Sequence, residues 1–111
     1  MSRILTIDQG TTSSRSIIFD INGDIEQVAQ EEYQLIFPND GWVEIDPEVL
    51  YKSVTNTLNQ LDLEGVKFGG ITNQRETTII WDKNTLELKC ILIPYYGCFS
   101  LVSYTSEFYA L

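Results

Sequence analysis

A polar stretch near the N-terminus combines the residue types that bind phosphate. Residues 8–15 read DQGTTSSR and bring together a carboxylate, four hydroxyls, a glycine and a guanidinium. Hydroxyl and backbone N–H groups donate to phosphate oxygens, Gly10 permits close approach, and Arg15 neutralises charge. Asp8 is suited to hold a hydrated Mg²⁺ that bridges those phosphates. The stretch is not a Walker A loop, because no Gly-Lys-Ser/Thr follows it and no helix is signalled.

A second polar cluster, residues 73–76 (NQRE), interrupts an apolar pattern later in the chain. Arg75 offers a forked donor and Glu76 offers acceptors, so the two together can hold a vicinal diol by complementary hydrogen bonds. Residue types alone leave plainer interpretations open for both clusters. An ordinary polar hairpin loop accounts for residues 8–15, and a surface ion pair accounts equally well for Arg75 and Glu76.

The elements that must position these residues are strands and one helix. Apolar, largely β-branched residues at 4–7 and 17–19 flank the first cluster and predict a β-hairpin. Asn22 and Gly23 form a strong turn signal, and residues 25–36 are predicted as a third antiparallel strand. Asp46 and Pro47 mark a helix start, since Asp caps the first turn and Pro lacks the N–H that would go unbonded there.

That helix is predicted to end near Asp62. Its packing face is predicted from apolar residues at helical spacing, namely Leu50, Val54, Leu58 and Leu61. Residues 66–72 (VKFGGIT) predict a strand that returns after the helix, and residues 77–81 predict another. The fold class is therefore α/β: a mixed sheet with an antiparallel N-terminal meander, a helix on one face, and a fourth strand that enters by a crossover.

Composition limits the classes of function. A chain of 111 residues forms one domain at most, and its net charge of −9 disfavours binding to nucleic acid or to an anionic membrane surface. The sequence has no His, so catalysis must rely on carboxylates, hydroxyls and Arg. Cys90 and Cys98 do not form a metal site on their own, while a disulfide between them and two free thiols both remain open.

The segment from residue 90 onward has a different composition. It carries one charge, Glu107, and is rich in Tyr and Phe. Pro94, Gly97 and the interspersed Ser and Thr disfavour a membrane-spanning helix, which needs about 20 uninterrupted apolar residues. Because the N-terminus lacks the apolar core of a signal peptide, we expect a cytoplasmic protein.

Three stretches give the chain a family resemblance: residues 8–15 (DQGTTSSR), 41–47 (GWVEIDP) and 70–78 (GITNQRETT). Their order and spacing resemble the N-terminus of the FGGY carbohydrate kinase family, and the likeness covers about residues 3–89. The first stretch points to the family as a whole. The third is similar to the branch that phosphorylates glycerol and differs from the sugar kinases.

The resemblance implies a fold of the actin and hexokinase type, of which this chain would form part of a ribonuclease-H-like domain. It also implies ATP-dependent phosphorylation of glycerol to glycerol 3-phosphate, with Mg²⁺. In that reaction the nucleotide phosphates would contact Thr11, Thr12, Ser13 and Arg15. Asp8 would hold the metal, while Arg75 and Glu76 would bind the glycerol hydroxyls. Glycerol and ATP are thus the expected partners, and the oligomeric state is not indicated.

The likeness ends after Lys89. We therefore expect an incomplete FGGY kinase N-terminal domain over residues 1–89 and a divergent aromatic-rich tail over residues 90–111. The family's catalytic base and its adenosine-binding domain have no counterpart here, so we assign no catalytic residue and expect the chain to be inactive alone. The alternative is a non-catalytic relic or interaction protein that keeps part of the actin-like fold. A different polyol or sugar kinase is a third possibility, which residues 73–78 disfavour.

Overall fold

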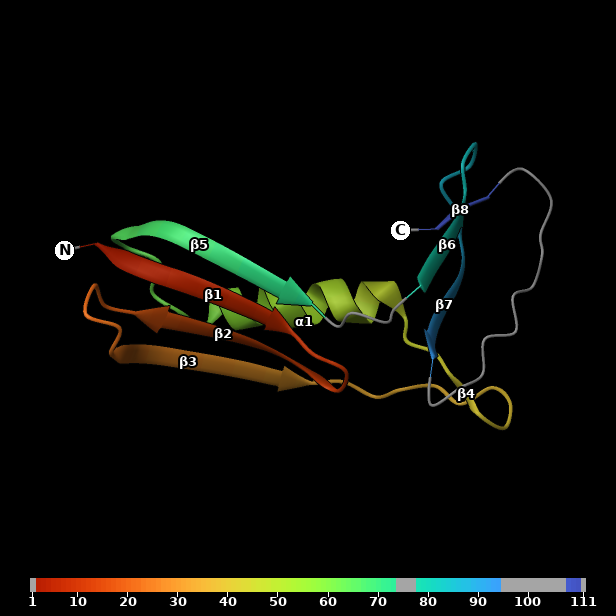
Figure 1. Cartoon of the computed structure of the whole chain (residues 1–111), viewed down its shortest axis with the longest axis horizontal. Helices are drawn as coiled ribbons and strands as arrows, with labels where there is room; N and C mark the ends of the chain where they lie inside the picture. Colours follow the sequence, from red (N-terminus) through yellow and green to blue (C-terminus); the bar gives the residue numbers. More distant parts are fainter. Residues whose placement is uncertain (1, 74–77, 95–107, 111) are drawn as a thin grey trace. The chain divides into compact units, whose positions relative to one another are not determined.

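The computed structural model describes the backbone of residues 2–73, 78–94 and 108–110, and the side chains of residues 2–73 and 81–87. The chain separates into two units (Figure 1). The first unit contains residues 1–34 and 48–74, and the second contains residues 35–47 and 75–111.

The first unit is a mixed four-stranded sheet with one helix. Its elements are β1 (Arg3–Gln9), β2 (Ser13–Phe19), β3 (Ile25–Glu32), α1 (Pro47–Asn59) and β5 (Val66–Asn73). The strand order is β3-β2-β1-β5, with β1, β2 and β3 antiparallel in sequence and β5 parallel to β1. A parallel neighbour requires a crossover, and α1 lies in that connection. The predicted α/β fold, with its meander and crossover strand, is confirmed.

Two element boundaries differ from those predicted. β3 ends at Glu32 and not at Ile36, which instead forms an isolated bridge with Glu44 in the second unit. α1 ends at Asn59, before Asp62, because the next two N–H groups bond to carbonyls only three residues back. Such tightened bonds are common where a helix ends.

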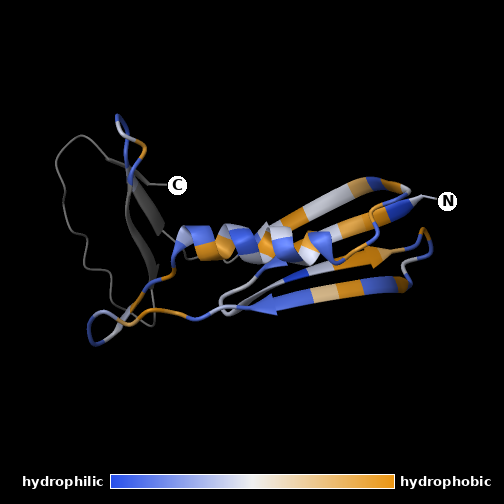
Figure 2. Ribbon diagram, turned by 180° about the vertical axis from the view of Figure 1, so that it is seen from behind, coloured by the Kyte–Doolittle hydropathy of each residue, from blue (hydrophilic) through white to orange (hydrophobic). Residues whose placement is uncertain are grey.

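α1 lies over one face of the sheet, as the view from behind in Figure 2 shows. Its most buried side chains are Ser53 and Thr57, which are 1% and 0% exposed. The predicted packing residues, Leu50, Val54, Leu58 and Leu61, are only half-buried and flank these two hydroxyls. The predicted packing face therefore has two buried hydroxyl side chains at its centre, which the spacing of apolar residues did not indicate.

Small hydroxyl residues on β2 explain this contact. Ser14 Oγ lies 2.7 Å from Ser53 Oγ, and Ser16 Oγ lies 2.7 Å from Thr57 Oγ1. The helix hydroxyls already donate to the carbonyls of Leu50 and Val54. Each serine of β2 must therefore donate its own hydrogen to its partner on α1, and all four buried hydroxyls are satisfied.

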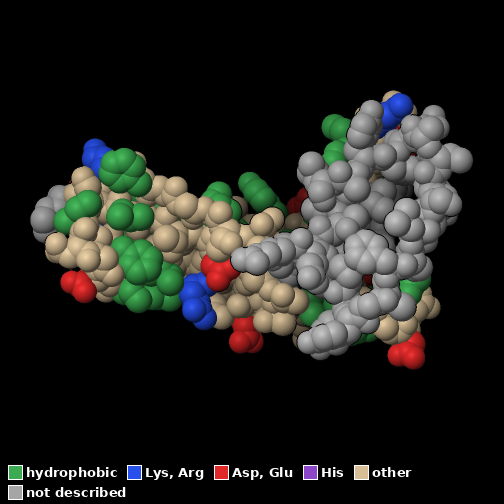
Figure 3. All heavy atoms as spheres, in the orientation of Figure 1, with side chains coloured by type: hydrophobic (Ala, Val, Ile, Leu, Met, Phe, Trp, Pro, Cys, Tyr) green, Lys and Arg blue, Asp and Glu red, His purple; other side chains and the backbone are tan. Residues whose placement is uncertain are grey.

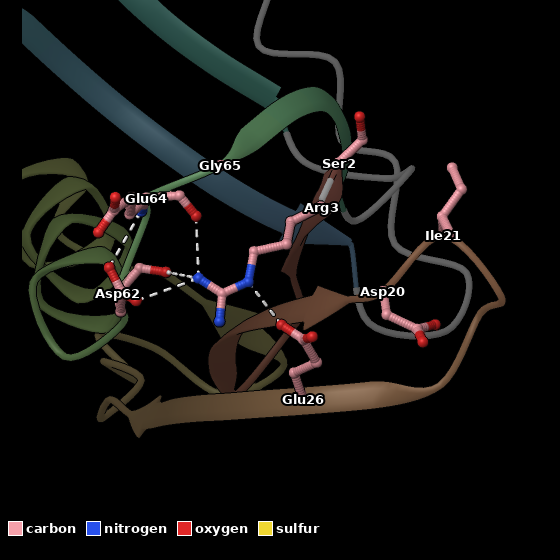
Figure 4. Close-up of a pocket in the computed structure, with 8 residues that line it drawn as sticks. All are labelled: Ser2, Arg3, Asp20, Ile21, Glu26, Asp62, Glu64 and Gly65. Atoms are coloured by element: carbon pink, nitrogen blue, oxygen red, sulfur yellow. Dashed lines mark hydrogen bonds and ion pairs between the residues drawn. The ribbon is translucent and has the colours of Figure 1, made fainter.

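Arg3 joins the other end of the sheet to the segment that follows α1, as Figure 4 shows. Its guanidinium donates to Glu26 at 2.6 Å, to Asp62 Oδ2 at 3.1 Å and to the Glu64 carbonyl at 2.9 Å. These groups line a hollow of about 350 Å³. Because Arg3, the cation of this hollow, is already paired with Glu26 and Asp62, we interpret the hollow as a structural junction.

The second unit is a small antiparallel sheet in the order β4-β7-β6-β8. Its strands are β4 (Trp42–Val43), β6 (Thr78–Asp82), β7 (Leu88–Pro94) and β8 (Phe108–Ala110). The strand predicted over residues 77–81 corresponds to β6. β7 contains Lys89, where we predicted the kinase-like domain to end, and that boundary stays a prediction. Within the part of the chain that the structure describes, no helix is long and apolar enough to cross a membrane.

Candidate functional site

The polar stretch comprises the end of β1, the connection at residues 10–12 and the start of β2. The Gly10 N–H donates to the Ser13 carbonyl at 2.9 Å, which leaves Thr11 and Thr12 at the exposed tip of the hairpin. A Cβ atom at position 10 would lie 3.0 Å from the Ser13 oxygen, so a larger residue would press on the turn. The predicted hairpin is thus confirmed, with Gly10 at the tightest point.

Asp8, Ser13 and Arg15 share one face of the sheet. Asp8 lies opposite Arg15 in the antiparallel register, and Ser13 is two residues from Arg15 along β2. This face is the one that α1 does not cover, because the alternate residues Ser14 and Ser16 contact the helix. Three of the predicted phosphate and metal ligands therefore lie together beside the loop, and the sheet separates them from the helix.

The Arg15 side chain is held by Gln30 on β3. Its Nε and Nη2 atoms donate to Gln30 Oε1 at 3.2 and 3.1 Å, and Gln30 Nε2 donates to Ser13 Oγ at 2.9 Å. Among the side chains of residues 2–73 and 81–87, no carboxylate forms an ion pair with Arg15. A neutral amide thus orients the guanidinium without cancelling its charge, which leaves that charge available to an anion.

Asp8 is exposed, and no described side chain pairs with its carboxylate. Across residues 2–73 and 81–87, no group of three or more His, Cys, Asp or Glu side chains forms a closed metal cage. Mg²⁺ normally keeps several waters and uses one or two carboxylates together with substrate phosphates. A single exposed carboxylate beside a loop rich in hydroxyl and N–H donors fits that pattern.

The predicted diol-binding residues, Arg75 and Glu76, lie outside the described residues. The end of the preceding strand is described, however. Asn73, the last residue of β5, pairs with Gln9, the last residue of β1. The carboxyl ends of these two parallel strands therefore meet beside the loop, at the kind of sheet edge where ligands bind in α/β proteins.

Gln30 was not predicted as part of the site, although the sequence carries a signal for it. Counting outward from Asn22-Gly23 as a two-residue turn places Arg15 opposite Gln30, which is the observed pair. The count reaches this pair only because the bulge between Ile18 and Phe19 offsets the observed turn, which is closed by Asp20 and Asp24 and has three residues. A glutamine on a surface strand also carries no functional signature by itself.

Comparison with known proteins identifies the kind of domain. The family model described as the FGGY family of carbohydrate kinases, N-terminal domain, matches residues 3–94. The glycerol kinase of Staphylococcus haemolyticus is 53% identical, over 74% of this chain and 18% of its own length. A glycerol kinase of Xylella fastidiosa is 52% identical over the same shares. The chain thus spans about a fifth of the length of these curated relatives.

Solved structures show the same fold. The Plasmodium falciparum glycerol kinase with ADP matches with a TM-score of 0.72 and 30% identity, over 84% of this chain and 20% of that chain. A gluconate kinase from Lactobacillus acidophilus matches with a TM-score of 0.72 and 24% identity, over 83% of this chain and 19% of that chain. The fold is therefore that of the actin and hexokinase type, as the resemblance implied.

Proposed function

Because the chain belongs to the FGGY family of carbohydrate kinases, we propose that its β1–β2 loop binds the phosphates of ATP in a protein that phosphorylates glycerol. The observation that carries this proposal is the shared face of Asp8, Ser13 and Arg15 beside the exposed tip formed by Thr11 and Thr12. Phosphoryl transfer depends mainly on positioning and charge neutralisation, and this face supplies donors and a positive charge.

Each residue has a distinct part in the proposed site. Arg15 neutralises phosphate charge, while the hydroxyls of Thr11, Thr12 and Ser13 donate to phosphate oxygens. Asp8 would hold Mg²⁺, whose chemistry when bound is to bridge phosphate oxygens and reduce their negative charge. Carboxylate, guanidinium and hydroxyl groups are enough for these roles. The proposed site therefore does not require a His, which the chain lacks.

Glycerol is the proposed substrate because two glycerol kinases are 53% and 52% identical to the chain. We assign the glycerol hydroxyls to Arg75 and Glu76, which follow β5 after its last residue, Asn73. A guanidinium and a carboxylate together satisfy both the acceptors and the donors of two neighbouring hydroxyls. Glycerol 3-phosphate would be the product, and cytoplasmic ATP the phosphoryl donor.

Phosphate binding is tested by titrating the 111-residue chain with Mg²⁺ and ATP in a calorimeter. The Arg15→Ala variant should bind at least about tenfold more weakly, since a charge-assisted contact is lost. Lys52→Ala, which removes an exposed positive charge from α1, is the matched control and should bind like the unaltered chain. Equal affinity of Arg15→Ala and the unaltered chain would count against the proposed phosphate site.

The chain alone should show no glycerol-dependent ATP consumption. It covers only 18% of the length of the glycerol kinases that it matches, and we assign none of its residues to the catalytic base. The measurement is a coupled assay of ADP release, with Arg75→Ala as the background. Turnover above that background would contradict this expectation.

A chain that binds neither ATP nor glycerol would instead support the non-catalytic alternative.

A further inference from the structure

We propose that Tyr33 is a positioning residue that makes the β1–β2 loop selective for anions. The inference rests on the proposed phosphate binding by this loop and adds a residue that the family motif does not contain. Tyr33 lies one residue beyond the end of β3 and contacts the loop through both its side chain and its backbone.

Three carbonyl oxygens of the loop are bonded within the chain. The Gly10 oxygen accepts from the Tyr33 hydroxyl and from Gln9 Nε2, the latter at 2.9 Å. The Thr12 oxygen accepts from the Tyr33 backbone N–H at 3.0 Å, and the Ser13 oxygen accepts from the Gly10 N–H at 2.9 Å. Tyr33 therefore engages two of the three oxygens.

The backbone N–H groups at the tip of the loop differ from these carbonyls. Among the residues that the structure describes, no acceptor bonds to the backbone N–H of Thr11 or Thr12. Because the carbonyls of Gly10, Thr12 and Ser13 are bonded and these two N–H groups are not, the loop presents positive ends of peptide dipoles, which attract an anion. If the carbonyls were released, their negative ends would compete for the same space and repel phosphate.

The Tyr33 hydroxyl is suited to hold one of these carbonyls. Gln9 Nε2 donates to the Tyr33 oxygen at 3.0 Å, so the hydroxyl hydrogen is directed to Gly10. Burial raises the pKa of the Tyr33 hydroxyl above its ordinary value, while the bond from Gln9 lowers it. The hydroxyl stays protonated at neutral pH, and it stays a donor.

The test is a calorimetric titration of the 111-residue chain with inorganic tripolyphosphate. Tyr33→Phe keeps the ring and removes only the hydroxyl, and we expect affinity to fall about fivefold, as for one hydrogen bond. Tyr51→Phe is the matched control, because Tyr51 is an exposed tyrosine of α1 at 69%. Its affinity should equal that of the unaltered chain.

Two further measurements separate positioning from general stability. Asn56→Ala removes a 3.1 Å bond between α1 and Glu31 without touching the loop, so it should lower stability and leave affinity unchanged. The amide resonances of Thr11 and Thr12 should shift with tripolyphosphate in the unaltered chain, and less so in Tyr33→Phe. If Asn56→Ala weakened tripolyphosphate binding as much as Tyr33→Phe does, stability alone would govern affinity. That result would overturn the inference.

The outcomes also distinguish this inference from the proposed function. If the unaltered chain binds tripolyphosphate and Tyr33→Phe binds it equally well, only the role of Tyr33 is overturned. If the unaltered chain does not bind tripolyphosphate, the phosphate site and the role of Tyr33 are both overturned.

Discussion

At the scale of single residues, the site depends on neutral side chains that hold charged or polar ones. Gln30 illustrates this, because its amide bonds to Arg15 on one side and to Ser13 on the other. A carboxylate at this position would also hold Arg15, but it would cancel the charge that a phosphate needs. The choice of an amide is therefore consistent with an anion site and not with a structural ion pair.

Gln30→Glu should weaken binding of ATP by about tenfold, because the new carboxylate pairs with Arg15 and repels phosphate. Gln30→Leu should weaken it less, since Arg15 keeps its charge and loses only its orientation. Both are measured by calorimetry, with Gln60→Glu, an exposed position just after α1, as a control for the added charge. A stronger effect from Leu than from Glu would contradict this explanation.

At the scale of elements, paired hydroxyls fix how α1 lies on β2. The two hydroxyl pairs, at 2.7 Å each, lie one helical turn apart on α1. A helix shifted along the sheet would leave the buried hydroxyls of Ser14 and Ser16 without acceptors, which costs about 1–3 kcal/mol for each. Such specific pairing restricts the helix to one register, whereas leucine side chains alone tolerate several.

Thr57→Val should lower the free energy of unfolding by about 1–3 kcal/mol, because it leaves the buried Ser16 hydroxyl without an acceptor. Ser16→Ala should cost less, since Thr57 still donates to the Val54 carbonyl. The double variant should be less destabilised than the sum of the two single variants, because neither polar partner remains. Urea unfolding measures all three, and strict additivity would refute the coupling.

The junction around Arg3 predicts how stability depends on pH. The pKa of Asp62 is lowered by the backbone N–H of Glu64 and then by Arg3, and the pKa of Asp20 by the backbone N–H of Asp24. Groups with a lowered pKa in the folded state stabilise it above their unfolded value of 3.8. That contribution is lost as the pH falls through the lower, folded-state values.

The urea midpoint should therefore fall in acid, below about pH 4. Asp62→Asn should lower the midpoint at neutral pH and reduce the loss in acid, since one of the two shifted carboxyls is gone. Asp40→Asn, an exposed change in the second unit, is the control and should leave the profile unaltered. An unchanged acid profile in Asp62→Asn would show that this carboxylate does not contribute.

At the scale of the whole molecule, the sheet face opposite α1 is notably apolar. Figure 3 shows hydrophobic side chains gathered on this face. By the strand register it carries Ile25, Val28 and Phe68, which are 60%, 53% and 64% exposed. Contiguous apolar surface of this kind promotes association in water.

The 111-residue chain should therefore bind a hydrophobic dye and associate as its concentration rises. Phe68→Ser should reduce both effects, because it removes the largest of the three exposed side chains. Leu86→Ser is the control, since Leu86 is 74% exposed in a turn of the second unit. Light scattering and dye fluorescence measure the difference, and equal behaviour of the two variants would exclude this face as the cause.

From the sequence alone, the order of the elements in the first unit and the composition of the loop could be predicted, whereas strands β4, β7 and β8 of the second unit were not predicted. Alternation predicts strands, Asn22-Gly23 predicts a turn, and Asp46-Pro47 predicts a helix start, because each is a local property of backbone and side chain. For the same reason the loop of residues 8–15 could be identified as a candidate phosphate site. Its resemblance to a family then gave that chemistry a specific reaction.

Which side chains meet depends on the tertiary structure. Register placed Gln30 against Arg15, and the path after β3 placed Tyr33 against the loop carbonyls. Helix packing selected Ser53 and Thr57, although the leucines of α1 had the stronger sequence signal. These contacts join residues 15 to 41 positions apart. Their geometry depends on bulges, twist and side-chain volume, which local patterns do not encode.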